Sequence, residues 1–382
     1  MELGRIPARM SSPSRVLVVN AGSSSLKLRL LDANDGILAR WDLPVPAGTV
    51  DRAGLARALA DHDPPDAIGH RIVHGGRRYL GPVRIDASVE RELRLLVDLA
   101  PLHQPKSLDA LDAVTEVYPR VPAVACFDTA FHAGMPAAAA TYALPREWRE
   151  RWDLRRYGFH GLSHAYATLR AGEMLAQPPE TFRAVTCHLG AGASLAAVAD
   201  GKSVDTTMGF TPLEGLVMAT RSGSVDPGLL LWLQEHVGMP AQELAATLEH
   251  RSGLLGLAGT ADMQVVLARA QAGDQPASLA LAVYLHRLRS GIAAMTAAMG
   301  GLDVLVFTGG VGEHSAPIRA AACEGLGYLG VHINRAANED APDMSQPDRD
   351  ITAHPAPVRT LIIEAREDLQ IAHEVRQVLG EP

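Results

Sequence analysis

The stretch VLVVNAGSSSLKLRLLD, residues 16–32, predicts two strands joined by a turn that holds a ligand. An apolar run leads into the small residues NAGSSS, and an alternating apolar run follows. A hairpin needs only about two turn residues. A longer turn of small residues lets backbone N–H groups approach an anion closely, and Lys27 follows it directly. The turn is therefore a candidate phosphate site.

The same layout returns later in the chain. TCHLGAGASLAAVAD, residues 186–200, again reads as strand, small-residue turn and strand, and His188 takes the place of Asn20 at an offset of 188 − 20 = 168. A chain of 382 residues also favours two domains. The repeat therefore predicts two similar α/β domains, each opening with a hairpin.

Between the hairpins, strands alternate with helices. Strands are expected within 67–76, 121–132, 302–314 and 358–365, helices within 51–62, 88–103, 315–327 and 368–379, and an irregular segment over 135–153. Polar and glycine-rich motifs stand where the strands end. Ligands bind at strand ends in open α/β sheets, so the site is expected there.

Composition excludes several classes of protein. The net charge of −8 argues against nucleic acid or an anionic membrane as a partner. No apolar run approaches the ~18 residues of a membrane span, and the first residues carry no apolar stretch of the signal-peptide type. The three cysteines lie far apart without ligand spacing, which indicates reduced thiols in a cytoplasmic protein.

Three glycine- or serine-rich loops follow apolar strands, at residues 20–25, 190–194 and 309–313. One such loop is as often a plain turn as a binding site. Three in one chain favour a nucleotide or polyphosphate site, although no G-x-x-x-x-G-K-[ST] motif occurs.

Two arginines stand among glycine, histidine and serine: Arg71 before IVHGG and Arg221 within MATRSGSVDPG. Most arginines lie on surfaces. In these apolar surroundings, however, a guanidinium fork is suited to binding carboxylate or phosphate.

Histidines and acids complete the candidate site. His160 and His164 are four residues apart in RRYGFHGLSH, so a helix would place them on one face. Zinc is the rival interpretation, but there is no HExxH pattern and no third ligand nearby in the sequence. A histidine directed at a phosphoryl group fits better. Asp128 ends a buried strand and Glu367 follows the last one, and such oxygen ligands suit Mg²⁺. Glu367 could equally be a helix N-terminal charge.

Together these motifs resemble the acetate kinase family. The matching segments run in order through nearly the whole chain: VVNAGSSSLK, GHRIVHGG, APLHQP, FDTAFH, RYGFHGLSH, HLGAGAS, TPLEGLVMATRSGSVDPG, SGLLGLAG and FTGGVGEH. The resemblance implies duplicated actin-like domains with a cleft between them and a homodimer formed through the second domain. We expect a disordered leader over residues 1–14, actin-like domains over 15–155 and 156–366, and a C-terminal helix over 367–382 that packs back on the first domain. It also implies Mg²⁺- or Mn²⁺-dependent phosphoryl transfer between ATP and acetate, giving ADP and acetyl phosphate.

The resemblance also implies roles for individual residues. Catalytic roles fall to Asp128, His160, Arg71 and Arg221, and metal binding falls to Asn20 and Glu367. The acyl group would be bound by Arg71, Val73, Leu102, His103, Phe159 and Pro212. The nucleotide and its phosphates would contact Asn20, Ser23, Ser25, Lys27, His188, Gly190, Gly192, Asp262, Gly310, Val311, Gly312 and His314.

Several positions depart from the family pattern: Ala191, Ala219, Ser224, Gln264, His314 and His373. Most lie on the nucleotide side, so a non-ATP phosphoryl donor stays open. Propionate or butyrate as acceptor is a second alternative, against which Val73 argues. An actin-like nucleotide-binding protein without catalysis is a third alternative, of a different class.

Overall fold

The structure is a computed structural model that describes residues 12–22, 25–45, 49–100, 103–340 and 347–380. It divides into two compact units. The first runs up to Ala130 and includes the chain from Arg366 onward, and the second runs from Phe131 to Ala365. Among the described residues, no helix is both long enough and apolar enough to cross a membrane.

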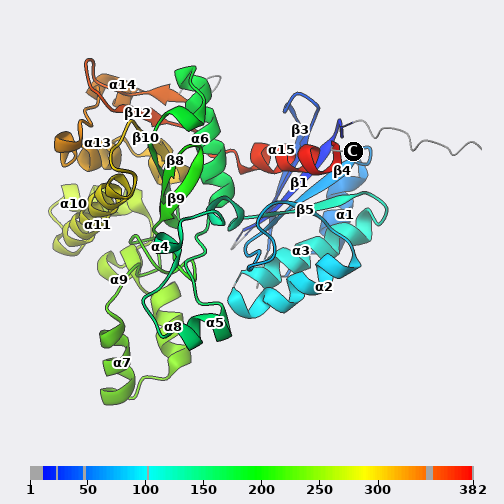
Figure 1. Cartoon of the computed structure of the whole chain (residues 1–382), viewed down its shortest axis with the longest axis horizontal. Helices are drawn as coiled ribbons and strands as arrows, with labels where there is room; N and C mark the ends of the chain where they lie inside the picture. Colours follow the sequence, from blue (N-terminus) through cyan, green and yellow to red (C-terminus); the bar gives the residue numbers. More distant parts are fainter. Residues whose placement is uncertain (1–11, 23–24, 46–48, 101–102, 341–346, 381–382) are drawn as a thin grey trace, which may run out of the picture. The chain divides into compact units, whose positions relative to one another are not determined.

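The first unit is a six-stranded mixed sheet with helices on both faces (Figure 1). Its strand order is β3-β2-β1-β4-β6-β5. The strands are β1 (Val16–Ala21), β2 (Ser25–Leu31), β3 (Ile37–Pro44), β4 (Ala67–Ile72), β5 (Val83–Arg84) and β6 (Ala123–Phe127). The helices are α1 (Arg52–Ala60), α2 (Ala87–Leu95), α3 (Gln104–Val117) and α15 (Glu367–Gly380).

The core of this unit explains the sequence pattern of its strands. Leu17, Val19 and Ile68 pack with Ala110 and Val114 of α3 on one face of the sheet. On the other face α15 lies so close to β4 that a Cβ on Gly69 would stand 2.4 Å from Ile371 Cγ2. The chain's last helix therefore completes the first unit, across a sequence separation of about 300 residues.

The second unit repeats this sheet. Its order, β9-β8-β7-β10-β12-β11, matches the first strand by strand, including the antiparallel hairpin and the parallel centre. The strands are β7 (Ala184–Leu189), β8 (Ala193–Ala199), β9 (Lys202–Thr206), β10 (Val304–Thr308), β11 (Arg349–Asp350) and β12 (Arg359–Ile362). Strands β1 and β7, and likewise β2 and β8, begin 168 residues apart (184 − 16 and 193 − 25). The duplicated α/β fold expected from the sequence is confirmed.

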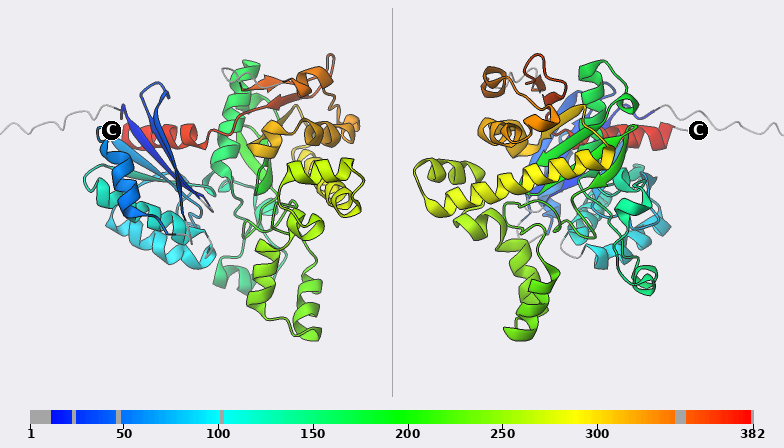
Figure 2. Two further views of the ribbon diagram at one scale, coloured as in Figure 1. Left: turned by 180° about the vertical axis from the view of Figure 1, so that it is seen from behind. Right: turned by 60° about the vertical axis from the view of Figure 1, so that its left-hand side comes forward.

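In the part of the chain that the structure describes, the second unit contains more helices than the first, and some of them pack on the faces of its sheet. Its helices are α4 (Ala137–Ala140), α5 (Arg146–Trp152), α6 (Gly161–Leu175), α7 (Pro227–His236), α8 (Ala241–His250), α9 (Gly253–Ala258), α10 (Met263–Gln271), α11 (Gln275–Met299), α12 (Gly309–His314), α13 (Ala316–Glu324) and α14 (Arg335–Glu339). Ala167 and Ala171 of α6 pack on one face, and the long helix α11 crosses the other (Figure 2).

Three local features differ from the sequence expectations. The first unit ends at Ala130, because residues 131–155 pack on the second unit: His132 bonds Ser203 and Tyr142 bonds Glu214. That segment, expected to be irregular, contains α4 and α5. Residues 309–313, expected to be a loop, are the start of α12, because Gly309 turns the chain at φ +77° directly after β10.

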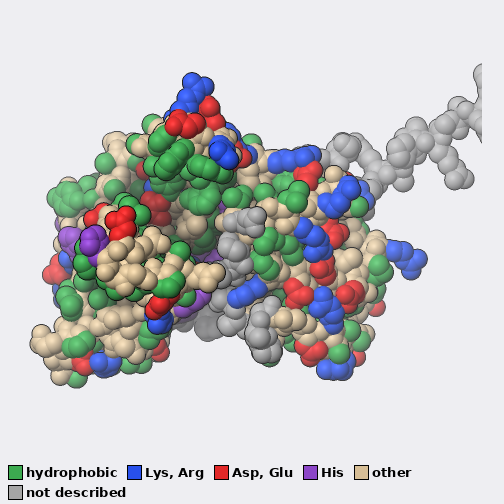
Figure 3. Space-filling view, turned by 90° about the horizontal axis from the view of Figure 1, so that it is seen from below, with side chains coloured by type: hydrophobic (Ala, Val, Ile, Leu, Met, Phe, Trp, Pro, Cys, Tyr) green, Lys and Arg blue, Asp and Glu red, His purple; other side chains and the backbone are tan. Residues whose placement is uncertain are grey.

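Charged side chains of both signs are mixed on the face of the molecule drawn in Figure 3. On the face drawn in Figure 3, Lys and Arg alternate with Asp and Glu among the described residues, and hydrophobic side chains lie between them. This mixture fits the mild net charge of −8.

Candidate active site

In the first unit, four of the predicted site residues converge at the ends of strands. Arg71 near the end of β4 forms a fork with Asp128, which follows β6: Nε donates to Oδ1 at 3.0 Å and Nη2 to Oδ2 at 2.6 Å. Arg71 Nη1 also donates to Asn20 Oδ1 at 3.1 Å, and Asn20 Nδ2 donates to Glu367 Oε2 at 2.8 Å. We call Asn20, Arg71, Asp128 and Glu367 the acid–arginine cluster.

The electrostatics of this cluster favour a fixed ion pair. Asp128 is 1% exposed, and this burial raises the pKa of its carboxyl while the Arg71 guanidinium opposes the rise. Burial alone would lower the pKa of Arg71, but the carboxylates of Asp128 and Glu367 raise it above its ordinary value. Arg71 therefore stays cationic, and the fork holds its guanidinium in one orientation.

The donor atoms of this cluster fit a magnesium ion. Glu367 offers a carboxylate and Asn20 an amide oxygen, and hard oxygen atoms are the ligands that Mg²⁺ prefers. Among the described residues, no three His, Cys, Asp or Glu side chains gather as a metal site. The protein would thus supply few ligands and leave the remainder to water and phosphate oxygens, which is usual for Mg²⁺.

In the second unit, the predicted histidines gather around one serine. His160 stands at the N-cap of α6 with φ 58°, and its Nδ1 lies 3.0 Å from Ser194 Oγ. His164, one turn further along α6, places Nε2 2.7 Å from the same oxygen. The His188 ring lies 4.4 Å from the His160 ring, centroid to centroid. We call His160, His164, His188 and Ser194 the histidine cluster.

Arg221 reaches the histidine cluster from a loop. Its Nε donates to Glu249 Oε1 at 2.6 Å, and both side chains are largely buried. A Cβ built on Gly192 would stand 3.3 Å from Arg221 Nη1 and 3.3 Å from His160 Nε2. The missing side chain of Gly192 is therefore what allows the guanidinium and the imidazole to approach the same point.

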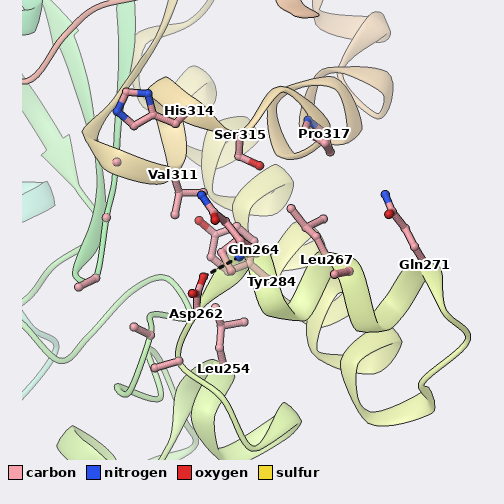
Figure 4. Close-up of a pocket in the computed structure, with 17 residues that line it drawn as sticks. Leu254, Asp262, Gln264, Leu267, Gln271, Tyr284, Val311, His314, Ser315 and Pro317 are labelled. Atoms are coloured by element: carbon pink, nitrogen blue, oxygen red, sulfur yellow. Dashed lines mark hydrogen bonds between the residues drawn. The ribbon is translucent and has the colours of Figure 1, made fainter.

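A cavity of about 500 Å³ in the second unit is lined by five of the twelve predicted nucleotide residues: Gly190, Asp262, Gly310, Val311 and His314 (Figure 4). Asp262 caps α10 by accepting from Gln264 N at 2.8 Å, and Val311 and His314 of α12 line the opposite side. None of the lining residues is Lys or Arg. The lining is Gly190, Ala191, Ala219, Leu254, Ala261, Asp262, Met263, Gln264, Leu267, Ala268, Gln271, Tyr284, Gly310, Val311, His314, Ser315 and Pro317. The cavity suits an uncharged, flat group better than a polyphosphate.

Several other predicted site residues belong neither to the acid–arginine cluster nor to the histidine cluster. Lys27 is the cross-strand partner of Asn20 and is exposed, and Ser25 begins β2. Val73 is 6% exposed and precedes His74, whose backbone N–H donates to Gln104 at the start of α3, next to His103.

Three further predicted site residues lie in the second unit. Phe159 is buried directly before His160, Gly312 accepts a hydrogen bond from Arg319, and Pro212 is half-buried. The predictions for Ser23 and Leu102 fall outside the described residues.

Sequence reasoning missed several functional candidates. Ser194 was assigned to a phosphate loop, but it lies in β8 and contacts two histidines. Glu249 pairs with Arg221 across 28 residues, and no sequence signal links them. Tyr284 and Ser315 line the cavity with buried hydroxyls that have no partner among the described residues. Tyr284 reads as an ordinary core position of α11, and only the structure reveals its place in the cavity.

Comparison with known proteins agrees with this geometry. The family model described as the acetokinase family matches residues 56–373. The chain belongs to the acetokinase family. It is 44% identical to the acetate kinase of Leifsonia xyli subsp. xyli over 96% of this chain and 99% of that protein. Family membership makes the chain a kinase with a carboxyl group as phosphoryl acceptor.

Solved structures of this family share the fold. The crystal structure of Porphyromonas gingivalis acetate kinase superimposes with a TM-score of 0.87 at 34% identity, covering 96% of this chain and 100% of that one. A propionate kinase from Francisella tularensis gives a TM-score of 0.87 at 34% identity, over 94% and 98% of the two chains. Kinases named for two different acids thus match this backbone equally well.

Proposed function

We propose that the protein transfers a phosphoryl group reversibly between ATP and acetate, giving acetyl phosphate and ADP. The observation that carries the proposal is the Arg71–Asp128 fork, together with membership of the acetokinase family. A guanidinium held rigidly at strand ends is suited to binding a small carboxylate or a phosphoryl group. The acid–arginine cluster and the histidine cluster are each assigned a role in phosphoryl transfer.

The reaction needs charge stabilisation rather than a general base. Acetate is already ionised at neutral pH, so one carboxylate oxygen attacks the γ-phosphorus directly. The bond between that phosphorus and the β–γ bridging oxygen breaks, and ADP leaves with the electron pair. Arg71, Arg221 and His160 reduce the repulsion between the two anions and hold them in line. Asn20 and Glu367 would hold Mg²⁺, which supplies further charge neutralisation on the phosphates.

The cavity beside α10 and α12 would take the base and ribose of the nucleotide. Its lining is mostly apolar and contains no Lys or Arg, so the phosphates would extend towards Gly190 and the arginines. Ala191, Gln264 and His314, which depart from the family pattern, all lie in this lining. A different nucleotide, or pyrophosphate, is therefore the second candidate for the phosphoryl donor.

The acyl side favours a short chain. Val73, Phe159 and Pro212 would contact the methyl group, with His103 nearby, and a single methylene is worth only about 1–3 kcal/mol in such a pocket. Propionate stays the second candidate for the acceptor, since a propionate kinase shares this backbone.

We propose that the protein forms a homodimer and that it acts in the cytoplasm. Large hydrophobic side chains are exposed on and just after α7: Leu229, Leu231, Trp232 and Val237. Such a group on one helix is suited to an interface between identical subunits. Sedimentation of the wild-type protein and of Trp232→Asp tests this: a dimer that dissociates in the variant supports the interface, and a wild-type monomer contradicts it.

The activity is tested by trapping acyl phosphate with hydroxylamine. Acetate, propionate and butyrate are each combined with ATP, GTP or pyrophosphate and Mg²⁺, and kcat/KM is measured for every pair. The proposal predicts the highest value for acetate with ATP. If acyl phosphate forms only with GTP or pyrophosphate, the substitutions in the cavity lining have changed the phosphoryl donor. If folded protein forms no acyl phosphate with any pair, the protein binds nucleotide without catalysis.

A further inference from the structure

Three polar side chains form a continuous hydrogen-bonded row that ends at His160. Thr186 Oγ1 lies 2.7 Å from His164 Nδ1, His164 Nε2 lies 2.7 Å from Ser194 Oγ, and Ser194 Oγ lies 3.0 Å from His160 Nδ1. Thr186, His164 and Ser194 are completely buried. Each of their hydrogens must therefore find its acceptor inside the row.

The single hydrogen of the Ser194 hydroxyl couples the two histidines. Ser194 can donate to only one of the two ring nitrogens that it touches, so the other nitrogen must donate to Ser194. Burial, together with repulsion from His132 and His188, holds the pKa of His164 well below its ordinary value, so His164 is neutral and carries one ring hydrogen. The tautomers of His160 and His164 are consequently linked.

Thr186 decides which way the row is oriented. Its hydroxyl has no acceptor among the described residues except His164 Nδ1. If His164 Nδ1 carried the hydrogen, the hydroxyl hydrogen of Thr186 would be buried without an acceptor, which is costly. Thr186 therefore donates to Nδ1 of His164, His164 donates from Nε2 to Ser194, and Ser194 donates to Nδ1 of His160.

We propose that Ser194 is a positioning residue that fixes neutral His160 in the tautomer with hydrogen on Nε2, which makes that nitrogen a donor to the transferred phosphoryl group. Nε2 lies on the side of the ring that faces Gly192 and Arg221. The catalytic half of this statement rests on the proposed function. The tautomer itself follows from the hydrogen-bond row alone.

The neighbouring histidine provides a matched control. His132 Nε2 lies 3.1 Å from the carbonyl oxygen of Phe159, and a carbonyl can only accept, so this nitrogen carries the hydrogen. His132 Nδ1 then accepts from Ser203 Oγ at 2.7 Å. Ser203 is thus a second buried serine that donates to a histidine Nδ1, but it does so for a ring whose tautomer is already set by a backbone carbonyl.

The experiment combines ¹⁵N NMR of the histidine rings with kinetics, in wild-type protein, S194A, T186V and S203A. In wild-type protein the long-range ¹H–¹⁵N spectrum is expected to show His160 and His164 with hydrogen on Nε2. S194A should mix the His160 tautomers and lower kcat by about 10- to 100-fold, with KM for acetate changed by less than about threefold. T186V should shift the tautomers in the same direction with a smaller loss of kcat.

Each outcome decides the matter. S203A is expected to leave the His160 signals unchanged and to keep kcat within about threefold of the wild-type value. A wild-type His160 with hydrogen on Nδ1, or unchanged His160 signals and kcat in S194A, would overturn the proposal. If S194A does not fold, T186V decides on the same criteria. If wild-type protein makes no acyl phosphate but shows the expected tautomers, the proposed function fails and the hydrogen-bond row stands.

Discussion

The two hairpins at the centre of the two sheets share one backbone and carry different chemistry. Asn20 and His188 occupy equivalent positions in β1 and β7, each the fifth residue of its strand. Asn20 joins a charged network with Arg71 and Glu367, whereas His188 lies against His160 and its Nδ1 contacts Ser163 Oγ. The duplicated scaffold therefore sets where polar groups stand, and the local residues set whether they join an ion-pair network or a cluster of histidines.

The largest expected effect concerns the ionic half of this comparison. Arg71→Lys keeps the charge but removes the fork to Asp128, so kcat should fall by about 10³-fold or more. The rate of acetyl phosphate formation measures it. Arg183→Lys is the matched control, because Arg183 forms a similar fork with Asp303 on the surface, and it should retain wild-type kcat. A kcat of Arg71→Lys within about threefold of wild type would remove Arg71 from the mechanism.

The next effect concerns the histidine half of the comparison. Gly192→Ala places a Cβ 3.2 Å from His160 Cε1 and 3.3 Å from Arg221 Nη1, so both groups must shift by a few tenths of an ångström. We expect kcat to fall by about tenfold, because alignment of the reacting groups is lost. Gly134→Ala, where a Cβ meets nothing within 4 Å, serves as control. Equal activities in the two variants would show that Arg221 and His160 do not need to converge.

His70 offers a test of what a histidine does without partners. Both ring nitrogens are buried and unpartnered among the described residues, and burial lowers the pKa of His70 to about 3. In the unfolded chain His70 takes up a proton below about pH 6.5, whereas in the folded protein it stays neutral down to about pH 3. Its effect on the free energy of unfolding is therefore absent above pH 6.5, and the folded protein loses stability as the pH falls from 6.5 towards 3. At pH 5 the loss is about 2 kcal/mol.

His70→Leu should therefore reduce the difference in unfolding free energy between pH 8 and pH 5 by about 2 kcal/mol, measured by urea denaturation. His74 and His132, each with a pKa lowered by burial to about 4, keep part of the acid sensitivity. A wild-type pH dependence in the variant would contradict the assignment of His70 as a buried neutral group.

The smallest expected effect is on acyl specificity. Val73→Ala enlarges the proposed acyl pocket, so the ratio of kcat/KM for propionate over acetate should rise about tenfold. Val124→Ala, a core substitution in β6, should leave that ratio unchanged even if it lowers stability. No change of the ratio in Val73→Ala would place the methyl group elsewhere.

The sequence predicted the parts of this fold that local patterns encode. The 168-residue offset identified the repeated hairpin, because strand, turn and strand are short-range features. The spacing of His160 and His164 predicted that both lie on one face of a helix, and in the structure both side chains point to Ser194. The resemblance implied metal binding for both Asn20 and Glu367 and a last helix that packs on the first domain, but the hydrogen bond between the two side chains, across 347 residues, is seen only in the structure.

Contacts made by tertiary packing could not be predicted from the sequence. Glu249 reaches Arg221 from α8, and Ser194 bonds two histidines of α6. The segment from Phe131 to Asp153 belongs to the second unit because of buried side-chain bonds such as His132 to Ser203, which periodicity does not reveal. Each of these contacts joins two separate elements of the fold, and the sequence of one element does not indicate which residue of another it will contact.

The most direct test of the account is the stereochemical course at phosphorus. Both clusters are assigned to stabilising charge, and no side chain is assigned to accept the phosphoryl group. Transfer from ATP with a chiral γ-phosphoryl group to acetate should then proceed with inversion, as a single in-line step. Net retention would mean two displacements through a phosphorylated side chain, with the histidine cluster as its first location, and would contradict the account.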